Sequence, residues 1–277
     1  MTQVEKNVVY GMYSGLALLM DVYRPERSKG HGIVYINGSG WHAPFAYDAG
    51  QLKETPLGMS YIDAMQDGGY TVFAINHRQA PRFRYPAAVE DAQRAVRFLR
   101  HHAERFGISP DRIGACGGSS GGHLVSLLGT LAGDGEPSDM DPVNRESARV
   151  QCVVARAAPV DLVKNLNSAV SDFMGMFPRG EADGDYSLEH ETYREASPVC
   201  HVSSQTAPFL LLAGTNDTVV PPEQPTMMTE ALKAAGVPVE LLWIEGAGHG
   251  PHFPGATNPP DYLGAMVIWF DRHLRGA

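Results

Sequence analysis

The chain has 277 residues, of which 43% are hydrophobic and 19% charged, and its formal net charge is −9. A chain of this length can bury a large core, so we expect a single domain over residues 1–277. The negative charge disfavours nucleic acid and anionic membranes as partners, and no apolar run is long enough to span a bilayer.

The N-terminal segment MTQVEKNVVYG lacks the basic stretch and apolar core of a secretory signal. A leader removed from the native chain stays an open alternative. Three scattered cysteines without metal-ligand spacing fit reduced thiols better than a disulfide framework. The sequence therefore predicts a cytoplasmic protein and implies no metal.

The first apolar stretch, VVYGMYSGLALLMDVY, alternates loosely and predicts an antiparallel hairpin at a sheet edge. Later apolar runs rich in Val and Ile predict buried strands at 32–38, 70–76, 112–117, 150–157, 208–214 and 239–246. Helical patterns occur at 86–106, 120–132, 223–235 and 261–274. This alternation predicts an α/β fold, with a mostly parallel central sheet flanked by helices on both faces.

Two segments break the alternation. Residues 133–149 are polar and rich in turn formers, whereas 164–206 holds aromatic residues and methionines among Gly, Pro and acids. Long irregular insertions are often lids or binding loops. We therefore expect a small lid in 164–206, with a solvated connection as the alternative. For 133–149, a binding loop and a solvated connection are equally good interpretations.

The stretch GACGGSSGGHL holds two adjacent serines that both fit the pattern G-x-S-x-G. A predicted strand ends here and a predicted helix begins, so the serines lie on a tight turn. A nucleophile elbow has this arrangement, with a helix N-terminus where negative charge develops. If the turn begins after Cys116, Ser119 is the nucleophile, and the backbone N–H of Ser120 points at the oxyanion. The lysine of a phosphate-binding P-loop is missing from GGSSGG.

A serine hydroxyl needs a general base that a third group orients. In LLLAGTNDTVVP, Asp217 follows one predicted strand, and in LLWIEGAGHG, His249 follows the next. Because the carboxyl ends of parallel strands meet at one sheet edge, both side chains should converge on Ser119. The chain order is then Ser, Asp, His. Asp161 and His252 are the fallback acid and base, although Asp161 could instead cap a helix.

Other residues complete the predicted site or compete with it. The glycine-rich turn NGSGW directly follows the strand over 32–38 and could supply oxyanion donors. Of the rival histidines, we expect His101 and His102 to face solvent and His123 to pack locally. Ordinary packing is the alternative for each candidate wall of the substrate pocket: Trp41, Phe173, Met174, Met176, Phe177 and Phe253.

On these motifs the chain resembles the α/β-hydrolase esterases and lipases, in the group related to hormone-sensitive lipase and to acetyl-xylan and feruloyl esterases. The sequence segments that resemble this group include DVYRP, NHRQAP, GGSSGGHL, YREASP and GTNDTVVPPEQ. In that group the serine motif reads G-G-S-A-G-G-H-L. The resemblance therefore implies Ser119 as the nucleophile, Ser120 in place of an alanine, and Asp217 and His249 as the catalytic acid and base.

The chain departs from the group's H-G-G-G motif, because N-G-S-G stands at 37–40. By position, the resemblance implies the backbone N–H groups of Ser39, Gly40 and Ser120 as oxyanion donors, provided that Ser39 can adopt the required dihedral angles. Asn37 need not make the hydrogen bonds of the usual histidine. The predicted lid is also smaller than the N-terminal cap of hormone-sensitive-lipase relatives.

The resemblance implies a carboxylesterase that forms an acyl-enzyme on a small-molecule ester and needs no cofactor. An amide or formamide hydrolase, such as an arylformamidase, uses the same triad and is the alternative. A non-catalytic binding member of the fold would typically have a broken triad. Exposed edge strands and the C-terminal amphipathic helix are compatible with a homodimer.

Overall fold

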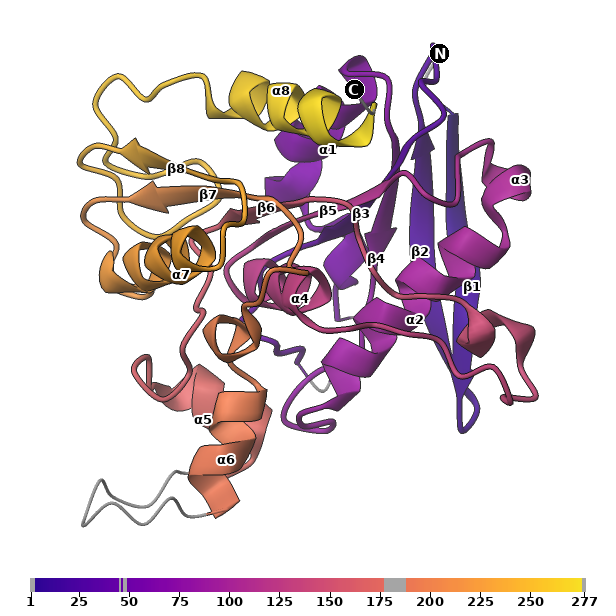
Figure 1. Ribbon diagram of the computed structural model, residues 1–277, viewed down its shortest axis with the longest axis horizontal. Helices are drawn as coiled ribbons and strands as arrows, with labels where there is room; N and C mark the ends of the chain where they lie inside the picture. The colour runs from indigo at the N-terminus through magenta and orange to yellow at the C-terminus, as the bar shows by residue number, and fades with distance from the viewer. Residues whose placement is uncertain (1–2, 45, 47–48, 177–187, 276–277) are drawn as a thin grey trace.

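The computed structural model of the chain describes residues 3–44, 46, 49–176 and 188–275. Its centre is one sheet with the strand order β1-β2-β4-β3-β5-β6-β7-β8 (Figure 1). The strands are β1 (Gln3–Tyr13), β2 (Leu16–Arg24), β3 (Gly32–Ile36), β4 (Thr71–Ile75), β5 (Ile113–Gly118), β6 (Val153–Arg156), β7 (Phe209–Gly214) and β8 (Val239–Ile244). Strand β2 pairs antiparallel with β1 and β4, and the strands β3 to β8 run parallel to one another. The predicted fold class, with its edge hairpin, is confirmed.

Helices cover both faces of the sheet. Helices α1 (Met59–Asp67) and α8 (Tyr262–Leu274) lie on one face, and α2 (Ala87–His101), α4 (Ser120–Thr130) and α7 (Glu223–Ala234) lie on the other (Figure 1). Successive residues of a strand point to opposite faces. In β3, accordingly, Ile33 joins the core beneath α1 and α8, and Val34 joins the core beneath α2 and α4. This double coverage explains why the predicted strands are continuous apolar runs.

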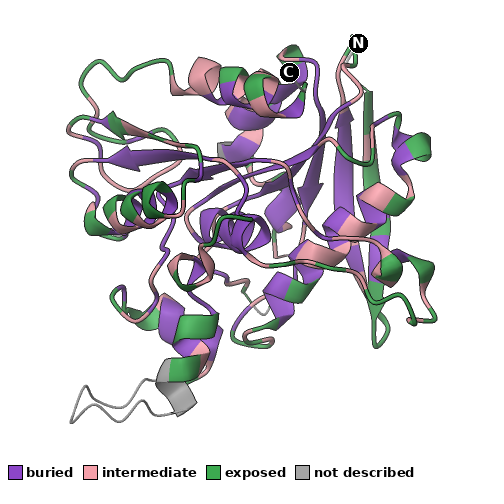
Figure 2. Ribbon diagram, viewed as in Figure 1, coloured by how far each residue is buried: buried purple, intermediate pink, exposed green. Residues whose placement is uncertain are grey.

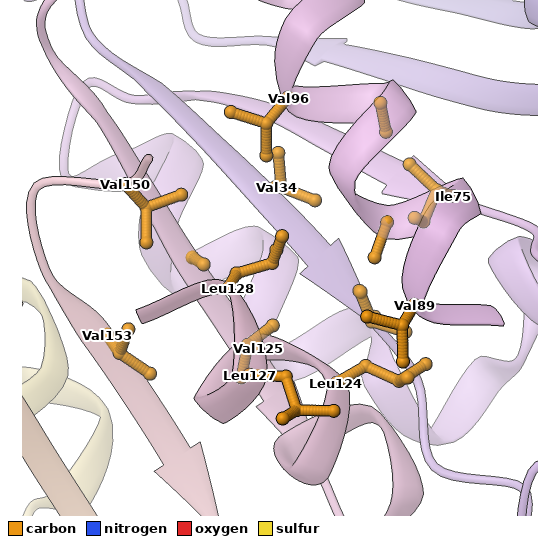
Figure 3. Close-up of a cluster of buried hydrophobic side chains, with 14 of the residues drawn as sticks. Val34, Ile75, Val89, Val96, Leu124, Val125, Leu127, Leu128, Val150 and Val153 are labelled. Carbon is orange, nitrogen blue, oxygen red and sulfur yellow. The ribbon is translucent and has the colours of Figure 1, made fainter. Parts of the chain in front are cut away.

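The larger core lies between the sheet and helices α2 and α4. Figure 3 shows side chains of the sheet and of both helices meeting there: Val34, Ile75, Val89, Val96, Leu124, Val125, Leu127, Leu128, Val150 and Val153. Each is buried, and burying one such side chain contributes about 1.5–3 kcal/mol. Figure 2 shows the central strands buried, whereas the edge strand β1 and the outer sides of the helices are largely exposed. Helix α4, which begins directly after Ser119, is buried along its whole length.

Some elements differ from the sequence prediction. The helix expected over 86–106 is interrupted at His102, and α3 (Ala103–Phe106) follows as a separate turn that ends at Gly107 with φ of 64°. Helix α1 was not predicted, since its nine residues form a short apolar face without a capping side chain. Within 133–149, the structure has only the 3₁₀ turn η3 (Pro142–Arg145).

The insertion over 164–206 contains α5 (Ser168–Met174), α6 (Leu188–Glu195) and the 3₁₀ turn η5 (Pro198–His201), and residues 177–187 lie outside the described part. Helix α5 packs beside the loop that follows β3. The ring of Phe173 stacks on Trp41 with a centroid distance of 4.7 Å, and Asp172 Oδ2 lies 3.0 Å from His42 Nε2. The insertion therefore borders the edge of the sheet where β3 ends.

Candidate active site

Ser119 lies on the turn between β5 and α4, with φ of 54° and ψ of −124°. Such dihedral angles are strained for a residue with a side chain, and they are the signature of a nucleophile elbow. The turn is tight enough to require glycine on both sides. A Cβ atom on Gly117 would lie 2.5 Å from the carbonyl oxygen of Gly121, and one on Gly121 would lie 2.0 Å from that of Ile36.

The structure brings Ser119, His249 and Asp217 into one hydrogen-bonded chain. His249 Nε2 lies 2.9 Å from Ser119 Oγ, and His249 Nδ1 lies 2.8 Å from Asp217 Oδ2. Asp217 follows β7 and His249 follows β8, so neighbouring parallel strands deliver both side chains to the serine. This geometry allows the imidazole to take a proton from the serine while the carboxylate fixes its tautomer.

The carboxylate of Asp217 is held on both of its oxygens. Oδ2 faces His249, and Oδ1 accepts hydrogen bonds of 2.9 Å from the backbone N–H groups of Val219 and Val220. Burial by itself would raise the pKa of this carboxyl group. The hydrogen bond with His249 and those from the two backbone N–H groups outweigh burial, so the pKa of Asp217 is lower than its ordinary value. The group is therefore ionised beside the imidazole at neutral pH.

The competing acid and base of the sequence analysis lie elsewhere. Asp161 Oδ1 accepts hydrogen bonds from the backbone N–H groups of Val163 and Lys164, so it closes a turn, and no helix begins there for it to cap. His252 is exposed, as is His101, while His102 is half-buried. In the part of the chain that the structure describes, His249 is thus the histidine in contact with Ser119, and Asp217 is the acid in contact with His249.

His123 is fully buried, and its hydrogen bonds reach beyond its own helix. The indole Nε1 of Trp41 donates to His123 Nδ1 at 3.2 Å, and His123 Nε2 lies 2.7 Å from the carbonyl oxygen of Ala196. The ring therefore donates through Nε2 and accepts through Nδ1, the pattern of a neutral imidazole. Burial lowers the pKa of His123 to about 4, against an opposing contribution from Ala196. His123 thus packs locally, as expected, and in addition contacts the insertion through Ala196.

The predicted oxyanion donors differ in what they bind. The N–H of Ser39 donates to Ser120 Oγ at 2.9 Å, so a side chain occupies it. For the N–H groups of Gly40 and Ser120, none of the described residues acts as acceptor. Gly40 and Trp41, with φ of 62° and 61°, both adopt the left-handed conformation in this loop. Two of the three predicted donors are thus unoccupied, and their role as an oxyanion hole stays a prediction.

Asn37 retains a structural role in this loop. Its Nδ2 donates to the carbonyl oxygen of Leu52 at 2.9 Å, and its Oδ1 accepts from the hydroxyl of Tyr35 at 3.2 Å. The residue is buried. Asn37 therefore connects the loop after β3 to the turn at Leu52, although it replaces the histidine of the H-G-G-G motif.

A cavity of about 240 Å³ opens beside Ser119. It is lined by Tyr35, Asn37, Gly38, Ser39, Gly40, Thr55, Ser119, Arg156, His249, Gly250 and Pro251. Tyr35, Thr55, Arg156 and Pro251 were not among the residues predicted from the sequence. A signal existed for Arg156, since it is a charged residue inside an otherwise apolar predicted strand.

The side chains predicted as pocket walls are absent from this described lining. Trp41, Phe173 and Met174 are buried in the core near α5, and Phe253 is buried in the core beneath α1 and α8. Met176 is 38% exposed, and Phe177 lies outside the described residues. Their aromatic and apolar character serves packing in the described structure, and a role as pocket walls stays a prediction.

In the described part of the chain, no three His, Cys, Asp or Glu side chains converge as metal ligands would. Across the same residues, every helix is too short or too polar to cross a bilayer.

The sheet order, the helices on both faces and the strained serine turn define the class of protein as an α/β-hydrolase. The chain belongs to the BD-FAE family, whose model matches residues 20–232. The resemblance to α/β-hydrolase esterases is thereby confirmed.

Relatives and solved structures agree with this membership. The chain is 27% identical to esterase LipC and 30% identical to the probable carboxylic ester hydrolase LipM, both of Mycobacterium tuberculosis (strain ATCC 25618 / H37Rv). These matches cover 88% and 82% of this chain and 59% and 51% of the relatives. The chain thus spans little more than half the length of these relatives.

Among solved structures, a truncated carbohydrate esterase from gut microbiota is 25% identical, with a TM-score of 0.79 over 99% of this chain and 97% of that one. An acetyl ester-xyloside bifunctional hydrolase from Caldicellulosiruptor lactoaceticus is 27% identical, with a TM-score of 0.74 over 92% of this chain and 88% of that one.

Proposed function

We propose that the protein is a carboxylic ester hydrolase in which Ser119 is the nucleophile, His249 the general base and Asp217 the residue that orients it. The observation that carries the proposal is the position of His249, with Nε2 at 2.9 Å from Ser119 Oγ and Nδ1 at 2.8 Å from Asp217 Oδ2. A serine hydroxyl is a weak nucleophile until an adjacent base removes its proton.

The reaction is a two-step acyl transfer. Ser119 Oγ attacks the ester carbonyl as His249 Nε2 takes its proton, and Asp217 stabilises the resulting imidazolium. The backbone N–H groups of Gly40 and Ser120 hold the oxyanion. His249 returns the proton to the departing alcohol, and water then releases the acid from Ser119. Each oxyanion donor typically contributes about 2.7–4 kcal/mol to the transition state.

Ester substrates are supported by the names of the relatives. LipC is called an esterase, LipM a probable carboxylic ester hydrolase, and a relative from Pseudomonas putida an ethyl acetate hydrolase. A cavity of about 240 Å³ is small compared with the roughly 300–1,000 Å³ of typical ligand pockets. We therefore expect short acyl groups to be preferred over long ones.

The chain is proposed to act as a single domain, with 164–206 as a small cap over the site. The support is local, since Ala169 Cβ lies 3.4 Å from the position of a Cβ atom on Gly40. Helix α5 therefore borders the oxyanion loop.

Hydrolysis of p-nitrophenyl esters from acetate to octanoate tests the proposal. The wild-type protein should hydrolyse the short esters, and Ser119→Ala should reduce turnover to the background rate while Ser120→Ala should not. A matched p-nitroanilide measures the amide alternative. Ester turnover that persists in Ser119→Ala would refute the assignment, and a wild-type protein inert on every ester would refute the esterase.

A further inference from the structure

Arg156 is a buried cation next to the proposed nucleophile. It ends strand β6 and is 7% exposed. Its carbonyl oxygen accepts the backbone N–H of Ser119 at 2.8 Å, so the two residues lie side by side across the sheet. A Cβ atom on Gly118 would lie 2.1 Å from Arg156 Nη2. The guanidinium therefore lies against the backbone of the elbow, and Arg156 lines the cavity together with Ser119 and His249.

The guanidinium lacks the partner that a buried charge requires. Nη1 donates to the carbonyl oxygen of Gly250 at 2.7 Å, and this is the one hydrogen bond that a described residue accepts from the side chain. Within the described part of the chain, no carboxylate forms an ion pair with it. Two aromatic rings also border the guanidinium, those of Tyr61 and Phe253, each 5.9 Å away. Arginine offers five N–H donors, and a charge taken out of water is costly unless an opposite charge compensates it.

Two other polar side chains of the cavity are already engaged inside the protein. The hydroxyl of Tyr35 donates to Asn37, and the hydroxyl of Thr55 donates to the carbonyl oxygen of Leu52. The contrast with Arg78 is informative, because that buried arginine pairs with both Asp91 and Glu90. Arg156 is thus a charged group at the cavity whose donors are left for a ligand.

We propose that Arg156 forms an anion subsite, and that the protein acts on esters carrying a carboxylate in addition to the ester bond. The inference rests on the proposed function. The planar guanidinium matches a carboxylate with two parallel hydrogen bonds, and the apolar rings beside it strengthen the attraction by excluding water. The second carboxylate would anchor the substrate while the ester carbonyl meets Ser119. Such a group is carried either on the acyl side or on the alcohol side.

A purely structural role for Arg156 predicts a different outcome. The hydrogen bond to Gly250 holds the residue that follows His249, so loss of Arg156 could displace the imidazole. That displacement would slow the hydrolysis of charged and neutral esters equally, through kcat. An anion subsite instead affects KM and only for the charged substrates.

The test compares charged and neutral esters of matched size. On the acyl side the pair is the p-nitrophenyl monoester of adipic acid and that of adipamic acid; on the alcohol side it is m-carboxyphenyl acetate and m-carbamoylphenyl acetate. The variants are Arg156→Gln and Arg156→Lys. The control is Arg272→Gln, which removes the same charge at an exposed position that pairs with Glu240.

We expect the wild-type protein to prefer the charged ester of at least one pair by about 10- to 100-fold in kcat/KM, the usual strength of a hydrogen bond to a charged group. Arg156→Gln should abolish this preference through KM, Arg156→Lys should retain part of it, and Arg272→Gln should retain all of it. Equal loss on both members of each pair, or no charged preference in the wild type, overturns the inference. Ser119-dependent turnover of the neutral esters would in that case leave the proposed function standing.

Discussion

Ser120 occupies the position where the resembling motif has alanine, and its hydroxyl binds the N–H of Ser39 at 2.9 Å. A donor that is already bound must release its partner before it can stabilise an oxyanion, whereas a preorganised donor pays no reorganisation cost. The hydroxyl of Ser120 therefore competes with the transition state for the Ser39 N–H.

Replacing Ser120 with alanine should remove this competition. We expect Ser120→Ala to raise kcat on p-nitrophenyl acetate by about 2- to 10-fold with little change in KM, since a complete oxyanion donor contributes about 10²–10³-fold. Steady-state kinetics of the variant and the wild type measures this change in kcat and KM. A hundredfold loss of kcat would show that the Ser120 hydroxyl itself assists the reaction.

The carboxylate of Asp217 is held so that its replacement by asparagine has a defined consequence. The amide oxygen of Asp217→Asn would accept the N–H groups of Val219 and Val220, which turns the amide NH₂ toward His249 Nδ1. The imidazole would then adopt the wrong tautomer, and we expect kcat to fall by about 10⁴-fold. Asp161→Asn, at the rival acid, is the control and should retain wild-type kcat. Comparable losses in both variants would contradict the role of Asp217.

At the scale of the elements, His123 connects α4 to the loop after β3 and to the insertion, through Trp41 and Ala196. Because burial lowers the pKa of His123 from 6.5 to about 4, the unfolded chain binds a proton at this ring over a pH range where the folded chain does not. The free energy of unfolding should therefore decrease as pH falls from about 6.5 to about 4.

The contribution of His123 to this decrease is about 3 kcal/mol, since one pKa unit corresponds to about 1.36 kcal/mol. His123→Gln cannot be protonated in this way, so its unfolding free energy should fall less steeply over the same pH range. Urea denaturation of both proteins at several pH values measures the difference. Equal slopes would mean that His123 is not held neutral in the folded protein.

The sequence predicted elements with a strong pattern and missed those that depend on distant contacts. The buried strands and helices α2, α4, α7 and α8 were found because their periodicity is local. Helix α5 was missed, since its position is set by stacking of Phe173 on Trp41, more than 100 residues away in sequence. The same reason explains the pocket walls: the sequence identifies apolar residues but does not distinguish those in the core from those at a cavity.

In the candidate site, too, local patterns predicted some residues, whereas distant contacts determine the others. The spacing of the motifs and the strand order could predict Ser119, Asp217 and His249, because parallel strands deliver their carboxyl ends to one edge. The hydrogen bond that occupies the Ser39 N–H depends on the rotamer of Ser120, which no local pattern specifies. Arg156 was visible as a charge in an apolar strand, but its position at the cavity follows from the pairing of β5 with β6.

For the whole molecule, one buried ion pair joins the N-terminal hairpin to the region of the site. Lys53 Nζ lies 2.8 Å from Asp21 Oδ1, and both side chains are fully buried. Asp21 belongs to β2, and Lys53 belongs to the 3₁₀ turn η1 (Leu52–Glu54), which leads to Thr55 at the cavity. The edge hairpin therefore supports the wall of the site through this contact.

Lys53→Met should destabilise the protein by about 3–5 kcal/mol, because it leaves the carboxylate of Asp21 buried without its charged partner. Lys6→Met is the matched control, since Lys6 pairs with Glu54 at the surface, and its urea midpoint should match that of the wild type. If the protein is a single domain, both variants should unfold in one cooperative transition. An unchanged midpoint for Lys53→Met would contradict the proposed support.

The central claim is that Ser119 forms the covalent intermediate, and peptide mapping after reaction with a fluorophosphonate tests it most directly. The reagent forms a stable bond with an activated serine, and tandem mass spectrometry identifies which serine carries the adduct. We predict one adduct per chain, on Ser119, with none on Ser120. An adduct on Ser120, or a chain that remains unmodified, would contradict it.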